Sequence, residues 1–134
     1  MKKTLFTLIA MLLLTACAPK AQPTAQDVLN SFTEAGAQIE NITEEARDSN
    51  SPLPNSYQEH YSFSIAEVAP SGGQIFVCDT KKNCDALYQY FDMLSGLGGP
   101  YYYQSPSGLI VAQLNSGLTP DTAAKFETVV NTYK

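Results

Sequence analysis

Residues 74–114 read QIFVCDTKKNCDALYQYFDMLSGLGGPYYYQSPSGLIVAQL, and they contain the most regularly patterned elements of the chain. The two ends of this stretch, 74–78 and 109–114, are short apolar runs bounded by turn-forming residues, as strands are. Between them, apolar side chains recur at the spacing of one helix face: Leu87, Tyr88, Phe91 and Leu94. The stretch predicts a strand, a helix that begins at Cys84 and ends at the glycines from Gly96 onward, and two further strands.

Two hairpins are predicted around this helix. Upstream, residues 61–65 (YSFSI) alternate between apolar and polar as in a half-buried strand. The turn signal at 70–73 (PSGG) would connect them to the strand at 74–78. Downstream, three tyrosines at 101–103 have high β propensity, and the sequence SPSG at 105–108 suits a type I turn that leads into the last strand.

The flanking segments add a first and a last helix. Thr24, with Asp27 three residues later, resembles a helix N-cap, and the apolar spacing that follows predicts a helix over 25–35. Thr119 followed by Pro120 is typical of a helix start, and it predicts a last helix towards the C-terminus. The residues after this first helix, from Ala37 on, predict a short strand.

Residues 43–60 are expected to form a long surface loop, because they contain two prolines, many turn formers and few apolar side chains. A loop of this length in a small domain is either functional or mobile. The complete pattern predicts a single α+β domain over 25–134: an antiparallel sheet of four to five strands with about three helices, largely on one face.

The first sixteen residues have the three parts of an export leader. Lys2 and Lys3 are followed by the apolar run LFTLIAMLLL at 5–14 and then by small residues before Cys17. Ten helical residues span about 15 Å, roughly half of a bilayer core, so the run is too short to serve as a permanent transmembrane helix. The pattern predicts a signal peptide at 1–16 that is removed on maturation.

The sequence Leu14-Thr15-Ala16-Cys17 resembles the lipobox of bacterial lipoproteins, in which a dedicated signal peptidase cuts just before the cysteine. The resemblance implies a diacylglyceryl group on the sulfur of Cys17 and an acyl group such as palmitate on its new amino terminus. Two or three acyl chains give stable anchoring. Residues 17–24 would then be a lipidated N-terminus and linker. Ala18, rather than Asp, implies the outer membrane if the host has one, and otherwise the cell membrane.

Charge argues against two classes of partner. The chain has a net charge of −5, and removal of Lys2 and Lys3 leaves six basic residues against thirteen acidic ones. An acidic chain without a Lys/Arg cluster is not expected to bind nucleic acid or to dock electrostatically on anionic lipid. The lipid on Cys17 would be the means of attachment to the membrane.

With Cys17 acylated, Cys78 and Cys84 remain as a pair. Exported proteins lie in compartments where disulfides persist, so the pair is expected to be bridged, joining the strand end to the helix start. A redox-active pair is the alternative, although the spacing is CxxxxxC rather than CxxC. The chain has one histidine, His60, and no second cysteine pair, so neither a metal site nor another cofactor is expected.

The functional prediction is a lipid-anchored binding or accessory module of the cell envelope, which is not an enzyme. The second half of 74–114 resembles small envelope lipoproteins, but no motif is specific enough to transfer an activity. Contacts with an envelope protein or glycan would come from loop 43–60 or from Tyr101, Tyr102 and Tyr103, which also suit a sheet margin. The alternative is a small hydrolase or thiol redox enzyme that uses His60, otherwise expected to be a solvated surface residue, or Cys78 and Cys84.

Overall fold

The sheet has five strands in the order β1-β2-β3-β5-β4, and each neighbouring pair is antiparallel. The structure is a computed structural model, and it describes residues 21–134. Both expected hairpins are present: β2 pairs with β3, and β4 with β5. The single α+β domain is therefore confirmed. The strands are β1 (Ile39–Glu44), β2 (Glu59–Ile65), β3 (Gly72–Val77), β4 (Tyr102–Gln104) and β5 (Ile110–Leu114).

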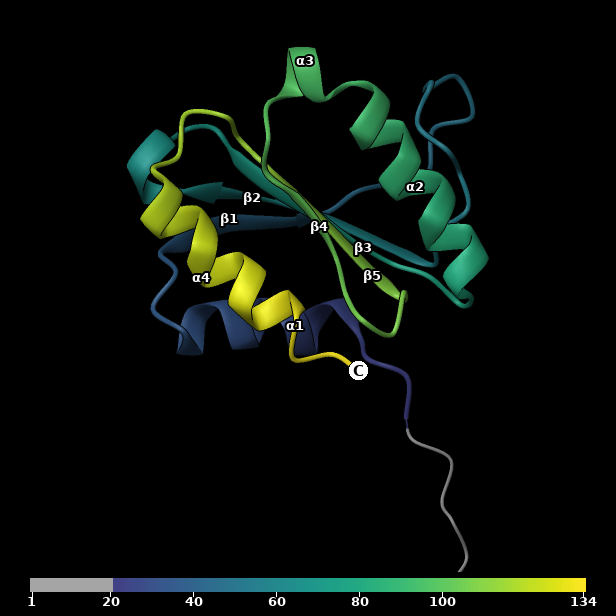
Figure 1. The fold of residues 1–134 in the computed structure, drawn as a ribbon, viewed down its shortest axis with the longest axis horizontal. Helices are drawn as coiled ribbons and strands as arrows, with labels where there is room; N and C mark the ends of the chain where they lie inside the picture. The colour runs from purple at the N-terminus through teal and green to yellow at the C-terminus, as the bar shows by residue number, and fades with distance from the viewer. Residues whose placement is uncertain (1–20) are drawn as a thin grey trace, which may run out of the picture.

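Helices lie on both faces of the sheet, so the prediction that they lie largely on one face was wrong (Figure 1). Strands β3 and β5 explain the difference, because each has large buried apolar side chains at consecutive positions that point to opposite faces. Helices α1 and α4 pack together under one face, and α2 packs on the other. The helices are α1 (Ala25–Glu34), α2 (Lys81–Met93), the short α3 (Ser95–Gly98) and α4 (Pro120–Val130).

The larger core lies between the sheet and helices α1 and α4. Phe126 of α4 lies at the centre of this core and is fully buried. Its ring centroid is 4.8 Å from that of Phe32 in α1 and 6.1 Å from that of Phe63 in β2. These three rings join the first helix, the last helix and strand β2 into one cluster.

The helix starts follow from their N-cap residues. Thr24 and Asp27 form a reciprocal capping box, and Thr119 caps α4 with Pro120 at its first turn, as predicted. Helix α2 begins at Lys81 rather than at Cys84, because the side chain of Thr80 accepts a hydrogen bond from the backbone N–H of Asn83. The polar run before Cys84 is therefore the first helical turn.

Two other predicted boundaries differ from the structure. The β1–β2 connection spans 45–58 rather than 43–60, because β1 continues to Glu44 and β2 begins at Glu59. Strand β3 begins at Gly72, within the expected turn. An added Cβ on Gly72 would lie 1.9 Å from the carbonyl oxygen of Phe63, so this glycine permits close strand approach and does not form the turn.

Of the anchoring elements predicted from the sequence, Cys17 and the leader at 1–16 lie outside the described residues. Within residues 21–134, no helix combines the length and apolar character that spanning a membrane requires.

Candidate functional site

Helix α2 covers only part of the second face of the sheet. Its Leu87 and Phe91 pack on Phe76 of β3 and Val111 of β5. Beside this covered part, the strand register brings uncharged polar side chains from all five strands into one row. In order across the sheet, the residues of this row are Thr43, Ser62, Gln74, Gln113 and Tyr102.

Two adjoining hollows lie over this row, and both are lined by Gln74 and Gln113. One, of about 520 Å³, lies between the end of α2, α3 and the 45–58 loop. The other, of about 580 Å³, extends over β1, β2 and the β2–β3 turn. We call the combined hollow the trough. Its floor includes Asn41, His60, Ser62, Ser64, Gln74 and Gln113, and its wall includes Leu53, Tyr90, Leu94, Leu97 and Tyr102.

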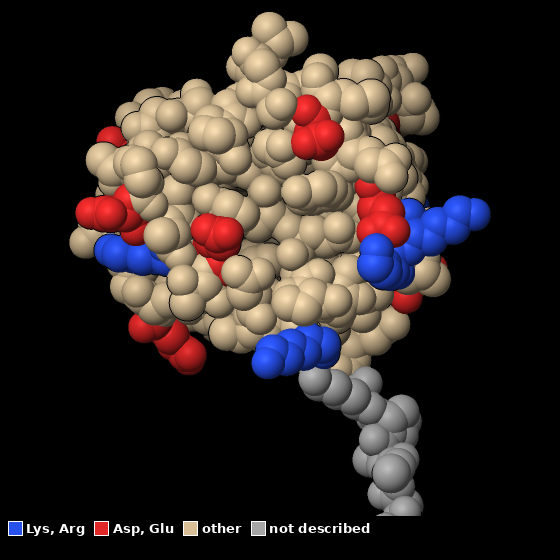
Figure 2. Space-filling view, viewed as in Figure 1, with Lys and Arg blue, Asp and Glu red and all other residues tan. Residues whose placement is uncertain are grey.

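No Asp, Glu, Lys or Arg lines the trough within the described part of the chain. The chain around it is acidic, with thirteen Asp and Glu against eight Lys and Arg. On the face shown in Figure 2, acidic side chains are scattered over the surface and the basic ones lie toward its edge. The lining of the trough is thus uncharged, and two carboxylates border it: Glu45 accepts from the hydroxyl of Ser62, and Asp92 accepts from the hydroxyl of Tyr102.

A directional chain of hydrogen bonds crosses the trough floor. The side-chain amide of Gln113 donates to the backbone carbonyl of Leu114 at 2.8 Å, and its oxygen accepts from the amide of Gln74 at 2.9 Å. The oxygen of Gln74 in turn lies 2.9 Å from Nε2 of His60. Because the Leu114 carbonyl only accepts, it orients both glutamines and requires that Nε2 of His60 carries the proton.

His60 lies in β2 and is half-buried, so the prediction of a solvated surface histidine was wrong. Its ring stacks on Phe76 with centroids 4.2 Å apart, and Tyr57 meets it edge-on at 5.2 Å. Burial lowers the pKa of His60 below its ordinary value, while the hydrogen bond to Gln74 and the charge of Glu45 act against this shift. A histidine that acts as a general base needs a neighbouring group that orients its ring. At His60, the side chain in this position is the amide of Gln74.

The three tyrosines separate as strand geometry requires. Tyr101 and Tyr103 pack against the larger core, and burial, assisted by the charge of Glu127, raises the pKa of Tyr103 to about 12. Tyr102 points to the opposite face and lines the trough. Its hydroxyl donates to Asp92 at 2.7 Å, and this hydrogen bond raises the pKa of Tyr102. All three are partly buried; Tyr102 and Tyr103 lie in the edge strand β4 and Tyr101 directly precedes it, which agrees with the sheet-margin interpretation.

The 45–58 loop lines the trough through Ser51 and Leu53 and packs against the α2 side of the domain. Its Leu53 and Tyr57 pack into the cluster under α2, and Ser56 donates to the backbone carbonyl of Asn83 at 2.8 Å. Arg47 donates to the carbonyl of Tyr57. The trough therefore brings together the loop and the tyrosine strand, the two regions that the sequence singled out separately.

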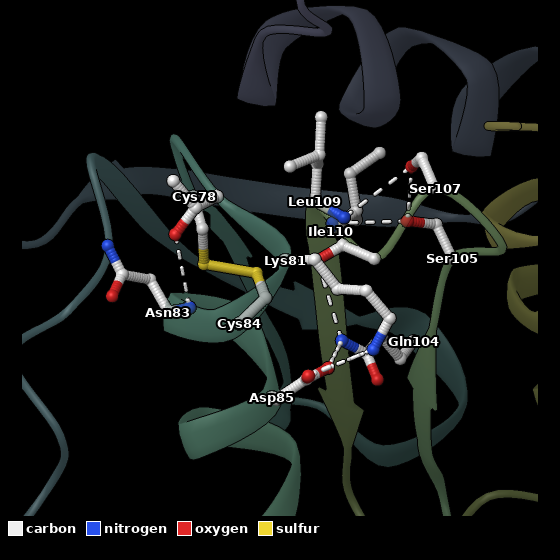
Figure 3. A network of polar contacts seen from close by, with 12 residues as sticks. Cys78, Lys81, Asn83, Cys84, Asp85, Gln104, Ser105, Ser107, Leu109 and Ile110 are labelled. Carbon is white, nitrogen blue, oxygen red and sulfur yellow. Dashed lines mark hydrogen bonds and ion pairs between the residues drawn. A yellow bond between two sulfur atoms is a disulfide. The ribbon is translucent and has the colours of Figure 1, made fainter.

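The disulfide between Cys78 and Cys84 is present, with a Cα–Cα distance of 5.6 Å (Figure 3). Both cysteines are fully buried, and they join the end of β3 to the first turns of α2. On the next turn, Asp85 pairs with Lys81 at 2.7 Å and accepts from Gln104 of β4 at 2.8 Å. The bridge and this network hold the start of α2 on the sheet, which is a structural role.

No group of three or more His, Cys, Asp or Glu residues suited to a metal ion occurs in residues 21–134. Sequence reasoning did not identify Gln74 and Gln113 as site residues. Each is a polar residue in an otherwise apolar strand, and this is the feature of the sequence that could have identified it as a site residue. No family model, curated protein or solved structure matches the chain.

Proposed function

We propose that this protein is a lipid-anchored binding module on the outer side of a bacterial membrane and that it holds an envelope ligand in the trough. The observation that carries the proposal is the trough itself, an open row of uncharged hydrogen-bonding groups beside a wall of apolar side chains. Binding sites combine apolar walls with a few oriented polar groups in this way. The wall residue Leu97 is 90% exposed, which is typical of a contact surface.

An extracytoplasmic location is supported by the disulfide, because such bridges persist in oxidising compartments. Attachment through Cys17 rests on the leader pattern and the lipobox resemblance. The described segment that leads into α1 enters the domain at the end opposite α3 (Figure 1). A lipid on Cys17, joined through a short linker, would thus hold the linker end near the bilayer and direct the α3 end of the trough away from it.

The test is photocrosslinking in intact cells. A diazirine amino acid is placed at Leu97 or at Ser51, which both line the trough, and at Ala124 on the exposed face of α4 as the matched control. We expect the same envelope component to be captured from Leu97 and Ser51 and not from Ala124. Equal capture from all three positions, or none from the trough, would contradict a ligand site there.

A second arm tests the anchor. Cys17→Ser removes the acylated sulfur, and we expect the variant to accumulate as an unprocessed precursor that takes up no palmitate label. Crosslinking from Leu97 should then decline, because the precursor lacks the lipid that would place the domain at its target membrane. A normally processed and acylated Cys17→Ser product would overturn the anchoring part of the proposal.

A further inference from the structure

The chemistry of the trough identifies the class of ligand. We propose, resting on the binding function above, that the trough binds a neutral glycan chain built from N-acetylated sugars.

Charge complementarity favours an uncharged ligand. The lining of the trough has no Asp, Glu, Lys or Arg, although the chain is acidic overall. Burial against Phe76 and Tyr57 lowers the pKa of His60 on the floor, which disfavours its charged form. A phosphate or carboxylate ligand would find no cation in the lining to pair with. The two carboxylates at its border, Glu45 and Asp92, already accept hydrogen bonds from Ser62 and Tyr102.

The floor offers matched donors and acceptors in fixed positions. The described hydrogen bonds use one N–H and one oxygen lone pair on each of Gln74 and Gln113, so each amide keeps one N–H and one lone pair for a ligand. An acetamido group presents the complementary pair, a carbonyl and an N–H. Because the Leu114 carbonyl fixes the orientation of both glutamines, the floor is preorganised for such a two-point contact.

The wall supplies apolar contacts of two kinds. Leu94 and Leu97 present aliphatic groups that suit an acetamido methyl, and Tyr102 presents an aromatic ring against which the apolar face of a sugar packs. The Tyr102 ring is held by its hydroxyl bond to Asp92 and by Tyr88, whose centroid is 5.3 Å away. Little ordering of this ring is then needed on binding.

The length of the trough favours a chain over a single sugar. The two hollows share Gln74 and Gln113 and extend from α3 to the β2–β3 turn. A peptide fits the floor less well. Extended peptides are usually held by main-chain bonds to a free strand edge, but the middle of the floor lies on β3, which is paired on both sides.

The test measures binding of N-acetylated chitotetraose to the full chain in a detergent without a sugar headgroup, with isothermal titration calorimetry. Cellotetraose has the same linkage but hydroxyls in place of the acetamido groups. We expect chitotetraose to bind about tenfold more tightly, which corresponds to about 1.4 kcal/mol. Equal affinity for the two sugars, or heat from neither, would overturn the inference.

Variants locate the contact. Gln113→Leu should weaken chitotetraose binding about tenfold, and the matched control Gln89→Leu, on the exposed side of α2, should leave it unchanged. Leu97→Ser is a second variant that cannot unfold the core, because Leu97 is almost fully exposed, and it should weaken binding about threefold. Unaltered binding in both Gln113→Leu and Leu97→Ser would exclude the trough as the glycan site.

Different results would refute the binding function and the N-acetylated glycan as its ligand. Crosslinks from Leu97 and Ser51 to one envelope component, without chitotetraose binding, would leave the binding function in place and refute the N-acetylated glycan. If that component proves to be a protein, the trough is a protein interface. Absence of trough-specific crosslinks would refute the binding function itself.

Discussion

Removal of the Cys78–Cys84 bridge should destabilise the domain by about 2 kcal/mol. The two cysteines are six positions apart, and the chain-entropy relation for a loop of this size gives about 2 kcal/mol at 25 °C. For a domain of about 110 residues, unfolding entropy is roughly 0.2 kcal/mol per kelvin, so the melting temperature should fall by about 10 °C. The loss is moderate because the closed loop is short.

The assay compares oxidised and reduced protein by urea unfolding. The chain from residue 18 to 134 contains both core clusters and lacks Cys17, so Cys78 and Cys84 are its only thiols. Both cysteines are fully buried, so reduction is carried out in the unfolded state and followed by refolding with reductant. The chain has no tryptophan, and tyrosine fluorescence with far-UV circular dichroism reports the transition.

The variant Cys78→Ala with Cys84→Ala separates the crosslink from the packing of the sulfurs. It should lose at least as much stability as the reduced protein, because two buried sulfur atoms are also removed, and it should not respond to reductant. Unfolding free energies of oxidised and reduced protein that agree within about 0.5 kcal/mol would refute the structural role of the bridge.

Three further changes test the core, the sheet and the trough. Phe126→Ala should cost about 3–5 kcal/mol by urea unfolding, because the ring is fully buried, whereas Thr128→Ala on the exposed side of α4 should stay within about 0.5 kcal/mol; equal losses would contradict the core assignment. Gly72→Ala should lower the melting temperature, since its Cβ would overlap the carbonyl oxygen of Phe63, and an unchanged value would mean that the strands approach less closely. His60 has a lowered pKa when folded, so the unfolded chain binds more protons and the unfolding free energy should fall as pH drops from about 7.5 through 6.5, until the folded-state pKa is passed. His60 is the sole histidine and carboxylates titrate below about pH 5, so His60→Gln should flatten this part of the profile; a slope that persists would assign the proton to another group.

The strands, helix caps and disulfide could be predicted from the sequence because each depends on local chemistry. Thr24 with Asp27 and Thr119 with Pro120 mark helix starts whatever the rest of the chain does. Errors arose where two local signals compete. Gly72 resembles a turn residue but serves strand contact, and the polar residues before Cys84 resemble a loop but form a capped helical turn.

The covering of the sheet could not be predicted, because it depends on which strands become neighbours. The runs 74–78 and 109–114 are apolar enough for central strands, yet nothing local shows that β5 lies between β3 and β4. Once it does, Phe76 and Val111 adjoin on the face opposite Ile75 and Ile110, and a second helix layer is needed.

The same pairing explains why the trough was invisible in the sequence. Gln74 and Gln113 are 39 positions apart, and only the β3–β5 register places them opposite one another. Gln74 lies two positions before the buried Phe76, and Gln113 lies two positions after the buried Val111, so each points to the same face as that residue. To cover the two glutamines, α2 would have needed one more turn of apolar side chains. The chain instead ends α2 at Met93 and changes direction at Gly99, which has a φ of 90°. Helix α2 therefore stops short of the polar row, and Gln74 and Gln113 remain only half-buried and line the trough.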